Sequence, residues 1–462
     1  LSRDADYSLS SATRNYLDSQ AVQGRERPIR MFLVYRRTSP FFERVRALCE
    51  QYASQSGGKI ELTVLEHMEG NDATEKFCAA YGLTLIDDLI LIDARTDDSP
   101  VTTELENRSK VLNPHIKLIT SEQMLAFEII GRERKITGFR GEDMMTARIV
   151  EAIEGKPRRM ALIADKSRIG RSDTSPSRKT LEDLLRFQNI ALTEMQIAGA
   201  ERIPEDIEGL VIVNPQYDFN EEEIAVLEDY WRRPRSAMLI LLGDQEVPPR
   251  FRSFLRKQGV TPRNDRIIGR SEDGWIAQAM ATFTEGIPFT RELARQSTEF
   301  GGASSSMEIR EGAEDLINRR IYPMALLEVH PGFWGESDFG VGEAAYDERS
   351  DHAAPLYLAA AVTRGAAGDD RFAADTSRMV VITNTDFLNP AHHRAQNLDF
   401  LSNAANWLVG RDALTGITPR AITTYKLPLL QSQATFINRL NLIFIPLLLI
   451  IAGGFVWSSR RA

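Results

Sequence analysis

The first 155 residues alternate between short apolar runs and longer segments whose apolar side chains recur at helical spacing. Phe41, Val45 and Leu48, for example, would lie on one face of a helix. The predicted strands are residues 29–35, 60–65 and 89–92, and the predicted helices are residues 39–56 and 73–81. This alternation favours a parallel sheet with right-handed crossovers. We therefore predict an N-terminal α/β domain over residues 1–155 that is thioredoxin-like or flavodoxin-like.

A second alternation begins after the linker Gly155-Lys156-Pro157. Its apolar runs are short and bounded by turn residues, which is typical of strands buried on both faces. These predicted strands are residues 160–164, 210–213, 238–242 and 379–383. Asn220 stands three residues before Glu223, the spacing of a helix capping box. We predict a doubly wound α/β domain over residues 156–410, which resembles in outline the amidotransferase-like sheets. Segments rich in glycine, serine and charge predict loops or insertions at residues 296–318 and 364–377.

The end of the chain departs from this pattern. Residues 440–457 contain no charged side chain, and this stretch is just long enough to cross a bilayer, which takes about 17–25 apolar residues. Trp457 ends this stretch as an interfacial aromatic residue, and the pair Arg460-Arg461 follows as a basic end. A buried core helix is the alternative, although such a helix is rarely apolar on every face. We predict a transmembrane helix at 440–457, a connector at 411–439 and a cytoplasmic tail at 458–462.

The two arginines also predict the orientation of the chain in the membrane. Positive charge collects on the cytoplasmic side of a span, so the domains before residue 439 are expected to lie outside the cytoplasm. A large exported domain needs a signal for export, and the first thirty residues contain no apolar signal region. We therefore expect a further N-terminal membrane helix that is missing from this sequence.

The composition of the chain limits the kinds of molecule that it is expected to bind. The chain carries a formal net charge of −9 and shows no basic patch, so we expect no nucleic-acid partner. Its two cysteines, Cys49 and Cys78, fall on predicted helix faces and lack the spacing of a metal or redox motif. Buried free thiols are the favoured interpretation, and a disulfide between the two stays open.

Motifs that carry chemistry are scarce. The sequence contains no P-loop, no G-x-S-x-G and no H-E-x-x-H, so we predict no catalytic residue, no cofactor and no metal. His392-His393 lies in a polar segment and is interpreted as a solvated loop.

Four residues are weak candidates for a ligand site. Asp165, Asp244 and Asp386 each follow a predicted parallel strand, and ligands of open α/β sheets bind at the carboxyl ends of strands. The same aspartates suit helix caps and loops equally well. Trp334 stands in an aromatic cluster with Phe333 that is interpreted either as a recognition surface or as core packing.

Three segments resemble a known family. Residues 4–19, DADYSLSSATRNYLDS, resemble the segment after the first membrane helix of GldG-like proteins, the auxiliary subunits of ABC-2-type transporters that were first associated with gliding motility. Residues 209–244 resemble the family's strand-helix-strand unit, except that Arg232 to Arg235 replace a glycine pair and Gly243-Asp244 replaces an aspartate-proline pair. Residues 377–420, from SRMVVITNTDFLNP to LTGITPR, are the best match.

The resemblance implies a non-catalytic role. It implies an extracytoplasmic scaffold or substrate-engaging subunit, anchored in a bacterial inner membrane beside an ABC permease and a separate cytoplasmic ABC ATPase. In the best-matching segment, Asn397 and Asp399 then suit helix caps, while Asp399, Asn403 and Trp407 recur every four residues and suit packing. Two other classes stay open: a membrane-tethered hydrolase, or a ligand-binding module, acting on cell-envelope glycans or peptides.

Overall fold

The structure is a computed structural model. It describes residues 8–67, 71–84, 87–104, 110–130, 133–169, 175–271, 274–291, 293–338, 345–365 and 375–412. All of these residues belong to one compact unit, Leu1–Pro419. The predicted span and tail, and the predicted connector beyond residue 412, lie outside the described residues. Within the ranges given above, no helix is long and apolar enough to cross a membrane.

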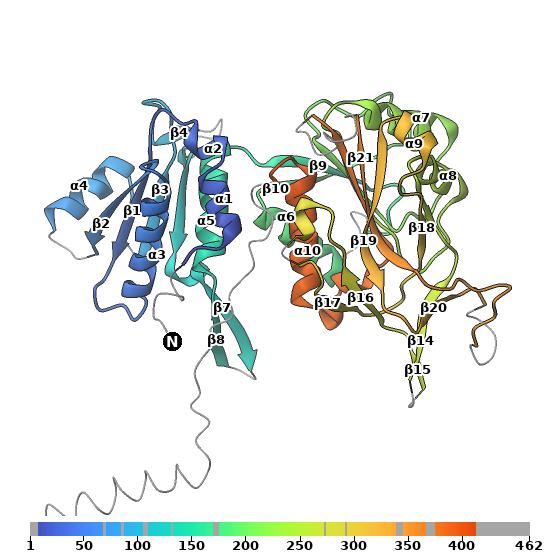
Figure 1. The fold of residues 1–462 in the computed structure, drawn as a ribbon. Coiled ribbons are helices and arrows are strands. Elements are labelled where there is room, and N and C mark those ends of the chain that lie inside the picture. Colours follow the sequence, from blue (N-terminus) through green and yellow to red (C-terminus); the bar gives the residue numbers. More distant parts are fainter. Residues whose placement is uncertain are drawn as a thin grey trace, which may run out of the picture. The chain divides into compact units, whose positions relative to one another are not determined.

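The N-terminal part contains a four-stranded mixed sheet, coloured blue to cyan in Figure 1. In spatial order its strands are β2 (Ile60–Glu66), β1 (Ile29–Tyr35), β3 (Leu89–Asp93) and β6 (Ile116–Thr120). The helices of this part are α1 (Ser11–Leu17), α2 (Gln20–Gln23), α3 (Phe42–Gln55), α4 (Asp72–Tyr81) and α5 (Gly141–Glu154). The predicted strands and helices are therefore confirmed. Two hairpins complete this part, β4 (Thr102–Glu104) with β5 (Lys110–Leu112) and β7 (Leu125–Ile130) with β8 (Glu133–Phe139).

The N-terminal sheet is mixed, so the expected parallel pairing holds for only one of its strand pairs. β1 pairs with β2 in parallel, but β3 runs antiparallel to β1 and to β6. A short apolar run reveals a buried strand and carries no information about its direction. The antiparallel register places Asp93, at the end of β3, directly opposite Arg30. Their side chains form an ion pair of 2.6 Å, so the charges favour the observed direction.

Asp93 forms several charged and polar contacts in this sheet. Its buried carboxylate also accepts hydrogen bonds from Arg95 (2.7 Å) and from the hydroxyl of Tyr81 (2.8 Å). Burial alone would raise the pKa of Asp93, but these hydrogen bonds and the charge of Arg30 outweigh burial and lower it. The folded state therefore favours the ionised carboxylate more strongly than the unfolded chain does.

This lowered pKa predicts a loss of stability in acid that depends on Asp93. The stabilisation is present above the unfolded pKa of about 3.9 and is lost as the pH falls through the lower pKa of the folded state. In Asp93→Asn, the melting temperature is expected to lie furthest below that of the unsubstituted protein near neutral pH, and the two should converge in acid. Circular dichroism melts over this pH range measure the difference. Asp229→Asn, at an exposed aspartate on α7 (Glu221–Arg232), is the control, and a gap for Asp93→Asn that stays constant with pH would contradict the assignment.

The second part is built on a large sheet with a parallel centre. Its parallel strands, in spatial order, are β10 (Ile190–Met195), β9 (Arg158–Ile163), β11 (Gly209–Val213), β12 (Ala237–Leu241) and β22 (Ser377–Ile382). Antiparallel strands continue the sheet as β21 (Tyr357–Arg364), β19 (Ile321–Val329), β16 (Ala279–Phe283) and β17 (Ser297–Phe300). The four strands predicted for this part are confirmed, and they are all parallel.

Helices cover both faces of this sheet, as a doubly wound arrangement requires (Figure 1). Leu181 and Leu185 of α6 (Pro176–Phe187) and Phe400 of α10 (Ala395–Leu408) belong to the apolar cluster on one face. Leu227 of α7 (Glu221–Arg232) and Phe254 of α8 (Pro249–Lys257) belong to the cluster on the other. α7 begins at the predicted capping box, in which Asn220 and Glu223 each bond the other's backbone N–H. The α/β class is thus confirmed, with helices on both faces of a parallel core.

Residues 296–318 are only partly a loop, contrary to the sequence-based expectation: residues 301–306 are irregular, and regular elements lie on either side of them. These elements are β17, β18 (Met307–Ile309) and α9 (Glu314–Asn318), and β18 pairs with β13 (Val260–Pro262). Ser304 and Ser306 are buried here, where their backbone or side chains are hydrogen-bonded. Small polar residues suit such a segment because they pack closely and can form hydrogen bonds with neighbouring segments, here with Asn384 and Asp265. The second predicted loop, 364–377, lies mostly outside the described residues.

Two smaller features complete the fold. A three-stranded sheet forms from β15 (Gly274–Ile276), β14 (Arg266–Ser271) and β20 (Phe333–Glu336). Cys49 on α3 is buried and Cys78 on α4 is partly exposed, and both thiols are free. Burial raises the pKa of each.

Candidate functional site

The carboxyl ends of the parallel strands carry the three predicted aspartates, and the structure separates Asp165 from the other candidates. Asp165 follows β9, and its carboxylate accepts the backbone N–H groups of Ile197 (2.9 Å) and Ala198 (3.0 Å). These residues lie just beyond β10, so Asp165 fixes the chain at the edge of the sheet. The alternative reading of this aspartate as a loop-stabilising residue accounts for its contacts.

Asp386 holds a neighbouring segment in the same way. It begins a short 3-10 helix after β22, and its carboxylate accepts the backbone N–H of Ala303 at 3.1 Å. Gly302 makes this approach possible: it has φ +75°, and a Cβ there would come within 2.0 Å of the Asp386 carboxylate. Nearby, the Asn384 amide donates to the carbonyl oxygen of Gly301 (3.0 Å) and to the Ser304 hydroxyl (2.8 Å). Two polar side chains from one loop thus fasten residues 301–304.

Segment 302–304 forms part of a cavity of about 350 Å³ at this edge. The other lining residues come from the three-stranded sheet and its flanks: Arg266, Ile267, Ile268, Trp275, Ala277, Glu336 and Asp338. Asp244, Asp386 and Trp334 do not line the cavity, but each contacts a residue that does. Asp244 is paired with Arg266 at 3.5 Å, and Trp334 lies edge-on to Trp275 with ring centroids 5.8 Å apart. Three of the four candidates therefore gather around one cavity.

The exposed aromatic side chain of this cavity is Trp275. Trp334 is buried, and its indole N–H donates to Glu336 at 3.1 Å, so the packing interpretation of Trp334 holds. Trp275 is 44% exposed, and the guanidinium of Arg270 lies 5.5 Å from its ring centroid. An exposed aromatic ring beside carboxylates suits contact with a flat or amphipathic ligand. Trp275 is not among the residues predicted from the sequence. Its position next to a polar stretch and a glycine is a sequence signal that could have indicated an exposed aromatic side chain.

A serine, an aspartate and a histidine also meet close to residues that line this cavity. The Ser306 hydroxyl donates to the Asp265 carboxylate at 2.6 Å, and His352 Nδ1 lies 3.1 Å from the same carboxylate. In a hydrolytic triad the histidine lies between the other two, because it must take the proton of the serine. Here the aspartate lies between them, and Ser306 is fully buried. This arrangement fixes the backbone of segment 304–306 and does not activate a nucleophile.

Residues 377–420, the segment that best resembles the GldG-like family, differ from the sequence-based prediction in one further respect. α10 begins at Ala395, so Asn397 and Asp399 lie inside the helix and do not cap it. Asn397 instead binds β17, by accepting from the Thr298 hydroxyl (2.7 Å) and donating to the Glu299 carbonyl (2.9 Å). Asn403 and Trp407 are buried, as the packing interpretation predicts.

The two adjacent histidines are likewise engaged by neighbouring residues. His393 Nε2 lies 3.1 Å from the Leu388 carbonyl and 3.4 Å from the Thr180 hydroxyl, while His392 packs against Gly301. Among the described residues, no group of three or more histidine, cysteine, aspartate or glutamate side chains is arranged to hold a metal ion.

Comparisons with known proteins give no family. No family model matches the chain, and no curated protein matches it. Among solved structures, the N-terminal domain of mmIFT52 aligns with 13% identity and a TM-score of 0.36, over 54% of this chain and 96% of that one. A ThuA-like protein from Bacteroides uniformis aligns with 13% identity and a TM-score of 0.33, over 56% and 96%. The exo-beta-1,4-mannosidase Op5Man5 from an Opitutaceae bacterium aligns with 13% identity and a TM-score of 0.24, over 60% and 40%.

Proposed function

We propose that this chain is a non-catalytic, membrane-anchored extracytoplasmic subunit of an ABC transporter at a bacterial inner membrane. In this role it works as a scaffold or substrate-engaging component beside a separate permease and a cytoplasmic ATPase. The motifs that resemble GldG-like proteins support the proposal. Two of them fall on complete structural units: residues 209–244 on β11, α7 and β12, and the described part of residues 377–420 on β22 and α10.

One observation carries the non-catalytic part of the proposal. At the carboxyl edge of the parallel sheet, where an enzyme of this class would hold its reacting groups, three polar side chains bind the protein's own backbone, while Asp244 pairs with the side chain of Arg266. Asp165, Asn384 and Asp386 each accept from or donate to main-chain groups of a neighbouring segment. Such contacts stabilise loops, and they leave these groups engaged when a substrate arrives. This supports a scaffold over a hydrolase.

The finer description of the fold belongs to the same proposal. The antiparallel β3 supports the thioredoxin-like alternative for the N-terminal part, because a flavodoxin-like sheet is wholly parallel. For the second part, the parallel centre with helices on both faces supports an amidotransferase-like sheet.

Co-purification tests the proposed assembly. The full-length, tagged protein would be extracted from membranes in mild detergent and its partners measured by quantitative mass spectrometry. We expect a multi-span permease and a P-loop ATPase in a constant ratio to the bait. A version ending at residue 439, without the predicted span, is the matched control and should lose the permease. Enrichment of neither protein over an unrelated tagged membrane protein, even after crosslinking, would overturn the proposal.

The Trp275 cavity favours a second candidate, a binding module for cell-envelope glycans or peptides. An exposed tryptophan beside Arg266 and Asp338 offers a stacking surface with polar groups at its rim. Trp275→Ala is expected to weaken binding of a recognised envelope fragment by about tenfold, since an aromatic contact of this kind contributes on the order of 1 kcal/mol or more. Isothermal titration with muropeptides and with cell-wall oligosaccharides would measure it.

Two controls make this second test specific. Tyr217→Ala removes an aromatic side chain that is 67% exposed and lies outside the cavity lining, so it should leave binding unchanged. Turnover of the fragments during the titration would instead support the hydrolase alternative. If no fragment shifts the melting temperature of the unsubstituted protein, the binding-module candidate fails.

A further inference from the structure

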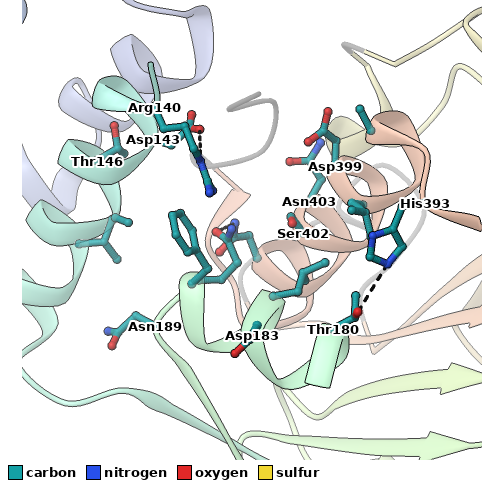
Figure 2. A pocket seen from close by; sticks show the side chains of 18 residues that line it. Arg140, Asp143, Thr146, Thr180, Asp183, Asn189, His393, Asp399, Ser402 and Asn403 are labelled. Carbon is teal, nitrogen blue, oxygen red and sulfur yellow. Dashed lines mark hydrogen bonds and ion pairs between the residues drawn. The ribbon is translucent and has the colours of Figure 1, made fainter. Parts of the chain in front are cut away.

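A second cavity, larger than the one beside Trp275, lies between α5, α6 and α10. Its volume is about 490 Å³, within the range of small-molecule sites. Figure 2 shows Arg140 and Asp143 at α5 on one side of it and Asp399, Ser402 and Asn403 on α10 across from them. No predicted site residue and no part of the Trp275 cavity contributes to it.

Apolar side chains supply much of the wall. Val150 comes from α5, Leu184 and Phe187 from α6, and Leu398 from α10. The guanidinium of Arg140 lies 4.7 Å from the ring centroid of Phe187. The positive charge of Arg140 is thus held against an aromatic ring, and its side chain narrows the pocket on that side.

Asp399 brings a carboxyl group into this apolar setting. Its side chain is half-buried, and no hydrogen bond or ion pair joins it to any residue that the structure describes. Burial raises the pKa of Asp399 to about 6. A carboxylate that loses water without gaining a partner is costly, and a cation placed beside it removes that cost.

The other charges around the pocket leave it acidic. Asp143 of α5 and Asp183 of α6 line it together with Asp399, whereas Arg140, which is paired with Asp143 at 4.0 Å, is its one lining arginine or lysine among the described residues. Asp183 is paired with Arg186, which points to solvent. His393, which precedes α10, is engaged by the Leu388 carbonyl and the Thr180 hydroxyl.

We propose that the pocket between α5, α6 and α10 binds a small organic cation, with an amine or guanidinium paired to Asp399 and an apolar body against Leu184 and Leu398. The cavity gives such a ligand room, the apolar wall gives it affinity, and the carboxyl gives it charge specificity. This site does not depend on the proposed transporter role or on the Trp275 cavity, so it can be tested independently of both.

Isothermal titration of the full chain with matched probes tests the site. 3-Phenylpropylamine and 3-phenylpropionate share one apolar body and differ in the sign of their charge. We expect the amine to bind at pH 7.5 and the carboxylate not to bind. Asp399→Asn should weaken amine binding by about tenfold or more, because a charge-assisted contact is lost. Asp183→Asn, at a rim aspartate already paired with Arg186, should change it by less than about threefold.

A pH series provides a test that needs no substitution. With a pKa near 6, Asp399 is mostly ionised at pH 7.5 and mostly protonated at pH 5, so amine affinity should fall by about tenfold between the two. Arg140, Asp143, Asp183 and His393 also face the pocket, and Asp399→Asn controls for their titration because it should lose this pH dependence.

A third probe identifies the source of the cation. An acetylated Phe-Lys amide that binds more tightly than 3-phenylpropylamine would indicate a lysine side chain of a polypeptide, and the reverse order would indicate a free amine. Equal binding of amine and carboxylate, no binding of either amine, or unchanged affinity in folded Asp399→Asn would overturn the proposal.

Discussion

Replacing Trp407 with alanine is expected to lower the free energy of unfolding by about 3–5 kcal/mol, the usual cost of removing a buried aromatic side chain. Trp407 lies on α10 and is completely buried. Its ring packs against Phe289 with centroids 5.1 Å apart, and the guanidinium of Arg378 lies 5.1 Å from its centroid. The substitution therefore leaves a cavity and removes two specific ring contacts.

Urea unfolding followed by circular dichroism measures this loss. Trp275→Ala is a matched control, because it removes the same side chain from a site that is 44% exposed, and it should change stability by no more than about 0.5 kcal/mol. Equal effects of the two substitutions would mean that α10 does not pack on the sheet as described.

Arg411→Ala is expected to cost about 3 kcal/mol of stability. The Arg411 side chain is 6% exposed, and it binds both carboxylate oxygens of Glu154, with Nε to Oε1 at 2.9 Å. It also donates to the carbonyl of Gln188. Removing one partner of such a pair leaves a charge buried without full compensation, which typically costs 3–5 kcal/mol. Arg158 and Asn189 still contact Glu154, so the lower end of that range is expected.

Two further variants define the origin of this effect. Arg202→Ala removes an arginine that is 70% exposed and should be nearly neutral. Arg411→Lys keeps the charge but loses the bidentate contact with Glu154. Its loss of stability should lie between those of Arg411→Ala and Arg202→Ala. If Arg411→Ala unfolds at the same urea concentration as Arg202→Ala, residue 411 does not bind the end of α5 in solution.

Much of the second part could be predicted from the sequence because a strand buried on both faces has a recognisable form. Residues 210–213 and 238–242 consist of consecutive apolar side chains between turns, and they form β11 and β12. Polar segments were harder to predict. The sequence predicts a loop at residues 296–318 because glycine and serine weaken any periodic pattern, yet Ser304 and Ser306 are buried and hydrogen-bonded in the segment between β17 and β18. Tertiary contacts of this kind cannot be recognised from the local sequence.

The sequence predicts the position of the candidate site better than it predicts the residues that form it. The rule that ligands bind at the carboxyl ends of parallel strands led to Asp244 and Asp386, which border the Trp275 cavity. Trp275 itself comes from a separate three-stranded sheet, whose pairing brings it to that edge. The sequence predicts a helix cap at Asp399 because it is a polar residue near the expected start of a helix. The helix begins four residues earlier, at Ala395, so Asp399 faces the second cavity instead.

The position of β22 has a consequence for how the chain acquires its structure during synthesis. β22 lies between β12 and β21, and Met238 of β12 pairs with Met379 of β22, although roughly 140 residues separate them in the chain. Until β22 emerges, β12 presents an open, wholly apolar strand edge to any other chain, which is a template for aggregation. The long sequence separation also predicts slow formation of the sheet centre. The centre of this sheet therefore cannot be completed until residue 382 has been made.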